Sequence, residues 1–398
     1  MREGRVAIVG GGAAGLCAAI SAARAGAHVT LLEAGPRVGR KILASGNGRC
    51  NLSNIAVAPE AYNDPGFAAP VLAEVSCEDI RAFFGELGLF TYADDEGRVY
   101  PITNAANSVL DVLRLEYAHL GVEERFGFEV ARIERGGNAL LVRSREGEAA
   151  EAGAVIVASG GGASALESLG HTRNPLWPAL VPLTTDTRSI RGLSGVRVRC
   201  AGSVLDSAGA VLATERGELL FRDYGVSGIM VLDLSRVAQP GSTLSLDFFP
   251  DVDALAMERL LAERVGNLGW RSAGTFFNGM LHTRVGQAIL RAAEVPSGTP
   301  GTSLDVSALA RLLKDFRLAI TGTGDPEQAQ VTRGGAALDQ FDAATLASRV
   351  APGVFAAGEV LDIDGRCGGF NLHWAWASGI VAGRGAAAHA ASAVGDPA

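Results

Sequence analysis

The sequence predicts an α/β protein in which one parallel-sheet domain is divided along the chain by a β-rich insertion and a small helical insertion. Three observations predict this fold class. A buried strand, a glycine-rich turn and an Ala-rich helix open the chain, and further apolar strands that run into glycines occur at 154–160 and 353–359. Between those two strands the apolar residues first alternate and then take helical spacing.

The start of the chain predicts a strand, a turn, a helix and a second strand. RVAIV at Arg5–Val9 is a short β-branched run, which is typical of a strand buried on both faces. The turn GGGAAG follows it, and we expect a helix from Ala14 to Ala25. A second apolar strand, His28 to Leu32, ends at Glu33. This order is that of a Rossmann-type nucleotide-binding unit.

The glycines of the turn stand at the three positions of a dinucleotide-binding fingerprint. Gly10 permits the tight turn, Gly12 lets the backbone approach a pyrophosphate, and Gly15 allows close packing of the helix on the strand. Ala13 and Ala14 open the helix, whose first N–H groups can bind phosphate oxygens. The turn therefore predicts a ligand that contains an ADP moiety.

The residues after the second strand indicate which ligand this is. Glu33 stands where a carboxylate binds a free ribose, which favours FAD or NAD over NADP. The loop 35–54 then carries basic, small and amide residues, where an NAD dehydrogenase usually continues with a helix and a strand. Such a loop suits a cofactor that extends past its ADP half, although taken alone the loop is more typical of a solvated basic segment. Its candidate contacts are Arg40, Lys41, Ser45, Gly46, Asn47, Arg49, Cys50 and Asn51.

The run GRKILASGNGRCNLSN at 39–54 resembles the signature of bacterial NAD(P)/FAD-dependent oxidoreductases of the aminoacetone oxidase-like or bile-acid reductase-like kind. Further similar segments lie at 88–101, 216–228, 330–348 and 353–383, in order over nearly the whole chain. The resemblance implies non-covalent FAD in a divided domain with two inserted domains. It also implies hydride transfer at flavin N5 to an unidentified small organic substrate, with either transiently bound NAD(P)H or another donor as the source.

The resemblance implies the remaining cofactor contacts. The strand–glycine–acid unit at 353–362 would lie beside the ribityl and phosphate groups, and the last helix would aim its N-terminus at the flavin N1/C2=O edge. Trp374 and Trp376 in that helix are more typical of a core. The contacts implied in this way are Val130, whose backbone would meet the adenine, Gly160, Gly358, Glu359, Asp362, Gly368, Gly369, Phe370, Asn371 and Leu372.

The pattern along the chain gives the expected domain limits. We expect the FAD-binding domain at 1–184 and 330–398, the β-rich domain at 185–250 with a return strand near 320–330, and the helical domain at 251–320. A helix is expected where Leu309, Leu312, Leu313 and Phe316 form one apolar stripe. Strands are expected at 126–133, 154–158, 196–206, 210–214, 217–221 and 242–249.

Composition narrows the class of protein. The chain has 398 residues, enough for two or three compact units, and its net charge of -8 argues against nucleic acid as the main partner. No apolar run is long enough to span a bilayer, so we expect no membrane partner. The five cysteines are scattered without a CxxC pair, which argues against a disulfide framework or a metal site and favours the cytoplasm.

Several questions stay open from the sequence. Tyr100, Tyr224 and His373 could donate a proton, but surface or core roles are commoner for each, so no catalytic residue is assigned. Cys50 and Cys367 could form a redox pair, although packing is the commoner role of free cysteine. No second G-x-G-x-x-G follows residue 160, so a dedicated NAD(P)H domain is not expected.

The function and the oligomeric state also stay open. The loop after Gly162 is shorter than in the resembled family, which leaves the substrate undetermined. A non-catalytic or sensory flavoprotein and a folate-dependent tRNA-modifying flavoenzyme remain alternatives.

Overall fold

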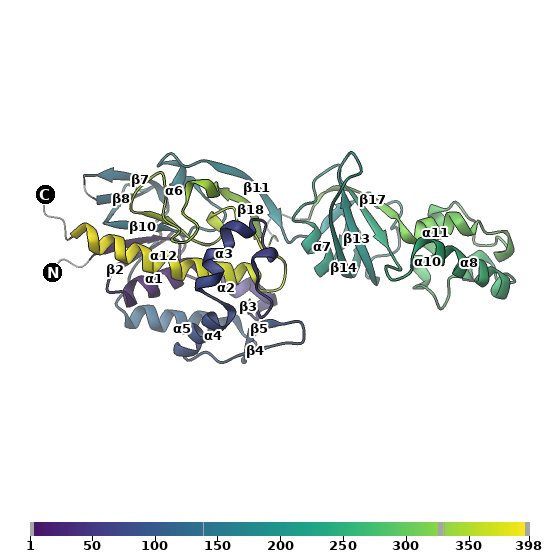
Figure 1. Cartoon of the computed structure of the whole chain (residues 1–398), viewed down its shortest axis with the longest axis horizontal. Helices are drawn as coiled ribbons and strands as arrows, with labels where there is room; N and C mark the ends of the chain where they lie inside the picture. Colours follow the sequence, from purple (N-terminus) through teal and green to yellow (C-terminus); the bar gives the residue numbers. More distant parts are fainter. Residues whose placement is uncertain (1–3, 138, 325–328, 330, 395–398) are drawn as a thin grey trace. The chain divides into compact units, whose positions relative to one another are not determined.

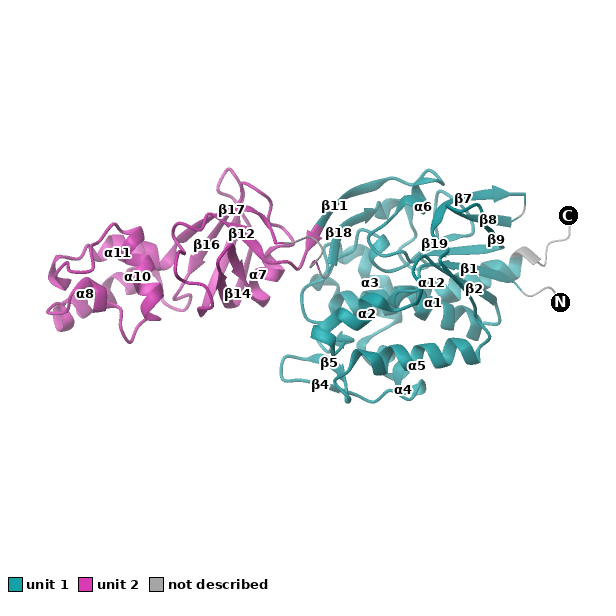
Figure 2. Ribbon diagram, turned by 180° about the vertical axis from the view of Figure 1, so that it is seen from behind, with its two compact units in different colours: residues 1–177, 331–398 teal, residues 178–330 magenta. Residues whose placement is uncertain are grey.

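The computed structural model describes residues 4–137, 139–324, 329 and 331–394, and the chain divides into two compact units (Figure 2). Unit 1 comprises Met1–Trp177 and Val331–Ala398, and unit 2 comprises Pro178–Gln330. The first break falls before the expected limit at 184, because β12 (Leu183–Thr185) pairs with strands of unit 2. In the described part of the chain, no helix is both long and apolar enough to cross a membrane.

Unit 1 is built on a five-stranded parallel sheet (Figure 1). Its strand order is β19-β10-β1-β2-β6, so strands from the beginning, the middle and the end of the chain pair directly. The predicted fold class, an α/β protein whose parallel-sheet domain is divided in sequence, is thereby confirmed. The strands are β1 (Arg5–Val9), β2 (His28–Glu33), β6 (Glu123–Phe126), β10 (Ala154–Val157) and β19 (Val354–Ala356).

Two helices from opposite ends of the chain pack together against this sheet. They are α1 (Ala13–Arg24) and α12 (Phe370–Val394), which lie side by side in Figures 1 and 2. Gly379 and Gly383 of α12 face the backbone of α1, where a Cβ would overlap the carbonyl oxygens of Ala14 and Ala18. Small residues at these positions let the helix axes approach, which brings the C-terminal segment beside the glycine turn.

Smaller elements complete unit 1. The sheet β3-β5-β4 precedes α5, the sheet β7-β8-β9 packs into the core of the main sheet, and β11 pairs with β18. The elements are α2 (Arg40–Ala44), the 3-10 turn η1 (Ser45–Gly48), β3 (Ser53–Asn54), α3 (Pro65–Glu74), α4 (Cys77–Glu86), β4 (Thr91–Ala93), β5 (Arg98–Pro101), α5 (Ala106–His119), β7 (Val130–Gly136), β8 (Ala139–Ser144), β9 (Ala149–Ala152), α6 (Ser164–Glu167), β11 (Arg173–Ala179) and β18 (Val331–Ala336).

Several local predictions were wrong. The single strand expected at 126–133 is two strands, because Gly127 takes a φ of 70° and turns the chain between β6 and β7. The two strands expected at 210–214 and 217–221 are one, β14 (Val211–Arg222). The loop expected at 35–54 contains the short helix α2 and the 3-10 turn η1.

Unit 2 begins with a closed six-stranded barrel, hereafter the barrel (Figure 1). Alternating residues such as Leu219, Phe221, Leu244 and Leu246 point inward and are fully buried. The barrel order is β12-β15-β14-β13-β16-β17, so the strand that follows the helical insertion closes it. Its members beyond β12 and β14 are β13 (Arg197–Leu205), β15 (Gly225–Ser227), β16 (Thr243–Asp247) and β17 (Phe316–Thr323), with α7 (Ile229–Leu234) beside them.

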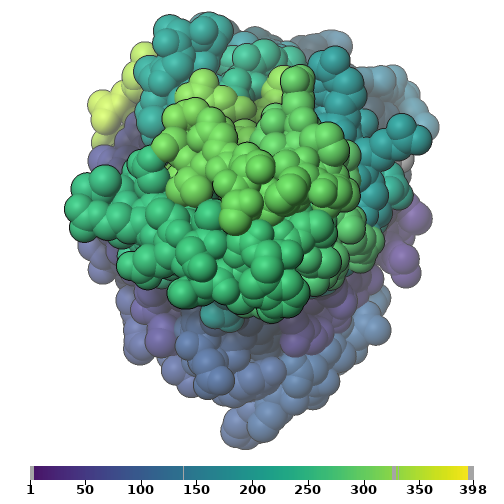
Figure 3. All heavy atoms as spheres, turned by 90° about the vertical axis from the view of Figure 1, so that its right-hand side faces the viewer, coloured from purple at the N-terminus to yellow at the C-terminus, as the bar shows by residue number. Residues whose placement is uncertain are grey.

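The helical insertion between β16 and β17 is hereafter the helical part, and its outer surface faces the viewer in Figure 3. Its helices are α8 (Ala254–Leu268), α9 (Ala273–Phe276), α10 (Thr283–Ala292) and α11 (Val306–Lys314). Phe316 was expected in the last helix but begins β17, because α11 ends at Lys314 and alternating burial starts there. The return strand therefore starts before the expected 320–330, of which residues 325–328 and 330 lie outside the described residues.

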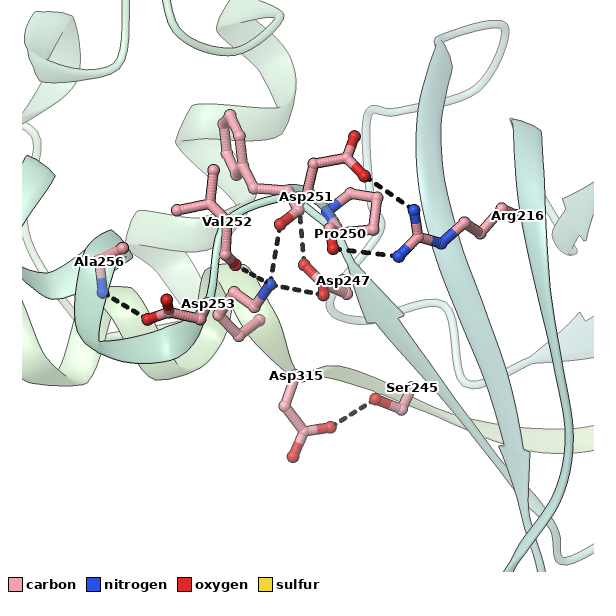
Figure 4. Close-up of polar contacts among 11 residues, drawn as sticks. Arg216, Ser245, Asp247, Pro250, Asp251, Val252, Asp253, Ala256 and Asp315 are labelled. Carbon is pink, nitrogen blue, oxygen red and sulfur yellow. Dashed lines mark hydrogen bonds and ion pairs between the residues drawn. The ribbon is translucent and has the colours of Figure 1, made fainter.

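A partly buried lysine, Lys314, joins the barrel to the helical part, and its partners Asp247 and Val252 are labelled in Figure 4. The ammonium of Lys314 donates to the carbonyl oxygens of Phe249 at 2.8 Å and Val252 at 2.5 Å, and it pairs with the Asp247 carboxylate at 2.6 Å. These partners satisfy its three N–H donors. Because Asp247 ends β16 and Lys314 ends α11, the cluster joins the two connections through which the chain enters and leaves the helical part.

Candidate cofactor-binding site

The predicted cofactor residues of unit 1 gather where the parallel strands end. Gly10 follows β1, Glu33 ends β2, Gly160 follows β10 and Gly358 follows β19. The first and third segments touch, since a Cβ on Gly10 would lie 2.5 Å from the carbonyl oxygen of Ala158. Ligands of open α/β sheets bind outside the carboxyl ends of the strands, and this edge is therefore the candidate site.

The glycine turn has the geometry that phosphate binding requires. Gly10 has a φ of 102°, and a Cβ on Gly15 would overlap the carbonyl oxygen of Gly10. Gly12, by contrast, has no heavy atom of the described chain within 4 Å of its Cβ position, so its face is open to a ligand. Gly12 is also the N-cap of α1 and no side chain caps that helix, which leaves the amides of Ala13 and Ala14 toward the opening.

The Glu33 carboxylate holds the backbone of the glycine turn by hydrogen bonds. Its two carboxylate oxygens accept from the amides of Gly11 and Gly35, each at 2.7 Å. The carbonyl of Glu33 accepts from the amide of Phe128 at 3.0 Å, which ties the end of β2 to the segment that leads into β7 at Val130. Contacts of Glu33 and Val130 with an adenosine stay predictions.

An ion pair crosses the middle of the candidate site. Lys41 and Glu359 are 2.9 Å apart, and the Cβ position of Gly160 lies 3.6 Å from both charged groups. Glu359 also accepts from the amide of Thr332, while the Lys41 side chain is 70% exposed. The pair links the segment after β2 to the segment after β19.

Both carboxylate oxygens of Asp362 already accept hydrogen bonds from other residues of the protein. Its carboxylate accepts from the amide of Gly334 at 3.0 Å and from the side-chain amide of Asn174 at 2.6 Å. The carboxylate therefore ties β11 and β18 to the C-terminal segment. A contact between Asp362 and the cofactor stays a prediction.

The start of α12 is tied to the polar loop 45–54. Gly368 and Gly369 have φ values of 120° and 105°, and a Cβ on Gly369 would overlap the carbonyl oxygen of Ser53. The side-chain amide of Asn54 donates to the carbonyl of Gly368 at 3.0 Å. Asn371 bonds back to both backbone groups of Gly365, so the turn before α12 is held from inside as well. Phe370 is buried and Leu372 is partly buried against the same core.

The side chain of Asn51 has an unused acceptor at this junction. Asn51 is 8% exposed, and its Oδ1 has no hydrogen-bond partner within the described chain. This oxygen lies 2.7 Å from the Cβ position of Gly369, at the N-terminus of α12. A buried acceptor without a donor is costly, and the N3–H of a flavin pyrimidine ring would satisfy it. The residues present therefore fit FAD.

The other residues of the predicted loop lie around this junction. Ser45 donates to the carbonyl of Ile42, and Gly46 and Asn47 both have left-handed backbone angles. Arg40 is exposed at the start of α2. The guanidinium of Arg49 lies over the ring of Tyr100, 4.6 Å from its centroid.

Sequence reasoning did not find a buried polar chain beneath α12. The Ser53 hydroxyl lies 2.9 Å from His373 Nδ1 and 3.3 Å from Cys77 Sγ, and His373 Nε2 lies 3.2 Å from the carbonyl oxygen of Val75. Burial lowers the pKa of His373 to about 4, so its ring is neutral at neutral pH. His373 therefore has a core role. These residues are far apart in sequence and carry no joint motif that could have signalled the chain.

Cys50, Trp374 and Trp376 of the two similar segments are buried in the core of unit 1. Cys50 is fully buried, and burial raises the pKa of its thiol to about 12, so it is not a reactive thiolate. Cys367 is partly exposed. The indoles of Trp374 and Trp376 donate to the carbonyls of Gly358 and Leu52, as expected of core residues.

The comparison with known families decides the relationship. A family model described as the HI0933-like protein Rossmann domain matches residues 4–385. The chain belongs to the HI0933-like family. The resemblance inferred from the sequence is thereby confirmed, because this HI0933-like chain is also 35% identical to a relative named as a bile-acid reductase.

Three curated relatives match this HI0933-like chain over nearly its whole length. The 3-dehydro-bile acid delta(4,6)-reductase of Clostridium scindens is 35% identical over 407 residues, 96% of this chain and 99% of the relative. The ribosomal RNA dihydrouridine synthase of Escherichia coli is 30% identical, over 93% of this chain and 95% of the relative. The protein of the same name from Haemophilus influenzae is 27% identical, with the same shares covered.

Proposed function

We propose that this protein is an FAD-dependent oxidoreductase that reduces a carbon–carbon double bond conjugated to a carbonyl group in a small organic substrate. The observation that carries the proposal is the buried, unpartnered oxygen of Asn51 at the N-terminus of α12. The open Gly12 turn suits the ADP end of FAD, and this second feature suits the flavin end.

The names of the relatives support this reaction class. A delta(4,6)-reductase of a 3-dehydro bile acid saturates double bonds conjugated to a ring ketone, and a dihydrouridine synthase saturates the uracil double bond conjugated to a carbonyl. Both reactions add a hydride to the carbon β to a carbonyl and a proton to the α-carbon. Reduced FAD supplies hydride in chemistry of this kind, and the protein supplies orientation and electrostatics.

Each cofactor contact has a distinct task in this proposal. The amides at the start of α1 bind the pyrophosphate, Glu33 binds the ribose, and Lys41 with Glu359 lies along the linker between the two halves. The N-terminus of α12 stabilises the negative charge of the reduced pyrimidine ring. Asn51 accepts a hydrogen bond from that ring and fixes its orientation.

NAD(P)H is the proposed electron donor, bound transiently. Unit 2 contributes an antiparallel barrel and helices rather than a second parallel sheet with a glycine turn. The donor would therefore use the substrate cleft before the substrate enters.

A second candidate is the reduction of uridine in ribosomal RNA. Two relatives carry that name, which counts against the exclusion of nucleic acid that the acidic charge suggested. The chemistry is the same in both candidates, and only the substrate differs.

The test begins with an absorbance spectrum of the purified protein and an anaerobic titration with NADH and then NADPH. Loss of the flavin bands with either nucleotide supports a reductase and identifies its donor. The reduced protein is then mixed separately with a 3-oxo-Δ4 steroid and with bacterial ribosomal RNA that lacks dihydrouridine. Reoxidation by the steroid supports the first candidate, and dihydrouridine detected by mass spectrometry supports the second. A flavin that stays oxidised with every donor would favour a non-catalytic flavoprotein, and failure to bind FAD would contradict the whole proposal.

A further inference from the structure

We propose that Tyr100 is the proton donor of this reduction: its phenol delivers a proton to the α-carbon of the substrate as the β-carbon receives the hydride. The inference rests on the proposed function, and it applies to either candidate substrate because both need a proton at the α-carbon.

Tyr100 lies close to the segment that carries Gly46 and Asn51. It belongs to β5, the central strand of the sheet β3-β5-β4, and β3 pairs with β5 through Ser53 and Val99. The Cβ position of Gly46 lies 3.6 Å from Tyr100 Cε1 and 2.8 Å from the backbone nitrogen of Asn51. Tyr100 therefore packs against the loop 45–54, which the proposed function places at the flavin end of the site.

The hydroxyl of Tyr100 is available, which sets it apart from the other tyrosines of unit 1. Tyr62 donates to the carbonyl of Phe370, Tyr92 donates to Asn104 and Tyr117 donates to Glu124. Tyr100 is 4% exposed, yet its hydroxyl bonds to no residue that the structure describes and is not sealed from solvent. The ring is thus packed in the protein while the hydroxyl reaches accessible space, as a positioned acid requires.

The surroundings of Tyr100 keep its phenol protonated at neutral pH and place a cation beside its ring. Burial raises the pKa of Tyr100, so the phenol keeps its proton until it is transferred, while Arg98 and Arg49 lower it and Asp94 and Tyr92 raise it. Arg98 is engaged by the carboxylates of Asp94 and Glu96. Among the described residues, Arg49 forms no ion pair. Its guanidinium over the ring is therefore free to stabilise the phenolate that proton transfer leaves.

The step balances. The carbon–carbon π bond of the substrate is replaced by two C–H bonds. The hydrogen at the β-carbon arrives with two electrons from reduced FAD, which is oxidised, and the hydrogen at the α-carbon arrives as a proton from Tyr100. The tyrosinate then regains a proton from water, and a nicotinamide or another two-electron donor reduces the cofactor again.

The test compares Tyr100→Phe with Tyr92→Phe, a matched control in the same sheet whose hydroxyl already has a partner, Asn104. Rapid mixing measures flavin reduction by the donor and flavin reoxidation by the enone separately. We expect reduction to be unchanged in both variants, and reoxidation to fall about 100-fold or more in Tyr100→Phe only. Equal reoxidation rates in the two variants would overturn the assignment. If the wild-type flavin is not reoxidised by the enone, the proposed function fails instead.

A second readout needs no turnover. Phenolate absorbance is titrated in the protein without FAD, and the wild-type curve minus the Tyr100→Phe curve isolates Tyr100. We expect Arg49→Met to raise the pKa of Tyr100, which tests the stabilisation of the phenolate by the guanidinium. If Tyr100→Phe does not fold, a fluorinated tyrosine at position 100 replaces it. Fluorine lowers the pKa of a phenol, so the loss of flavin reoxidation rate at high pH should begin at a lower pH. An unchanged pH dependence of reoxidation in the fluorinated protein, or an unchanged pKa of Tyr100 in Arg49→Met, would contradict the role of Tyr100 as proton donor.

Discussion

At the scale of single residues, Gly12 and Gly15 have different roles in the first turn, and substitution of each can distinguish ligand binding from packing. Gly12 has an ordinary φ of -82° and open space at its Cβ position, whereas a Cβ on Gly15 would overlap backbone. We expect Gly12→Ala to leave the melting temperature of the cofactor-free protein unchanged while FAD affinity falls about tenfold or more. Gly15→Ala should instead lower the free energy of unfolding by at least about 2 kcal/mol.

Thermal melts and FAD titrations of the two variants check this pair. A Gly12→Ala variant that binds FAD as tightly as the wild type would place the pyrophosphate elsewhere.

His373 gives a prediction for pH. Its pKa is lowered to about 4 in the folded protein from an ordinary 6.5, so the unfolded chain binds more protons between these values. Stability is therefore full above the unfolded pKa and decreases as the pH falls toward the folded pKa. Between about pH 7 and about pH 5 we expect wild type to lose about 2 kcal/mol more than His373→Gln. Urea unfolding of both proteins at the two pH values measures the difference, and parallel losses would show that His373 is not buried neutral.

Sequence patterns located some site residues and could not locate others. Gly10, Gly12 and Gly15 follow from a motif whose spacing encodes one local turn. The chain of Cys77, Ser53 and His373 joins positions 24 and 320 residues apart, and only the packing of α12 brings them together. The amide type of Asn51 suggested a polar contact, but its unpartnered, buried state depends on the fold.

At the scale of elements, local periodicity predicted β1, α1 and β2 almost to the residue, because each buries a regular stripe. The strand expected at 126–133 failed at Gly127, since a turn glycine inside an alternating run cannot be distinguished from a strand glycine by pattern alone. The pairing of β12 with β17, which closes the barrel, could also not be predicted from the sequence. β17 pairs with β12 across the whole insertion, and such long-range pairing leaves no local signal.

The junction between the barrel and the helical part yields a third prediction. Lys314→Met removes all three partners of the ammonium and leaves Asp247 partly buried without its cation. We expect a loss of about 2 kcal/mol in the free energy of unfolding, with faster amide exchange in residues 251–315. The control is Arg216→Gln, in which the exposed pair of Arg216 with Asp251 is lost at a cost within about 0.5 kcal/mol. Equal exchange in both variants would contradict the role of Lys314.

At the scale of the whole molecule, the chain leaves and re-enters unit 1 at one place. β11 leads into unit 2, β18 returns from it, and the two strands pair. An insertion with adjacent ends can be added without disturbing the parallel sheet, because the strands β10 and β19 still meet directly. The sequence indicated this division by the reappearance of a strand–glycine unit at 353–359, whereas the pairing of β11 with β18 needed the structure.

The net charge of the whole molecule allows the two candidate substrates to be distinguished, because only RNA binding depends strongly on charge. RNA binding depends on neutralising phosphates with cations, so it weakens steeply with salt. The chain has a net charge of -8, and many of its arginines are already paired, as Arg216, Arg188 and Arg384 are. We therefore expect the reduced protein to be reoxidised by a 3-oxo-Δ4 steroid at a rate that hardly changes with salt, and ribosomal RNA at equal uridine concentration neither to compete nor to acquire dihydrouridine. Competition that disappears as salt rises, together with dihydrouridine in the RNA, would instead assign the chain to the second candidate substrate.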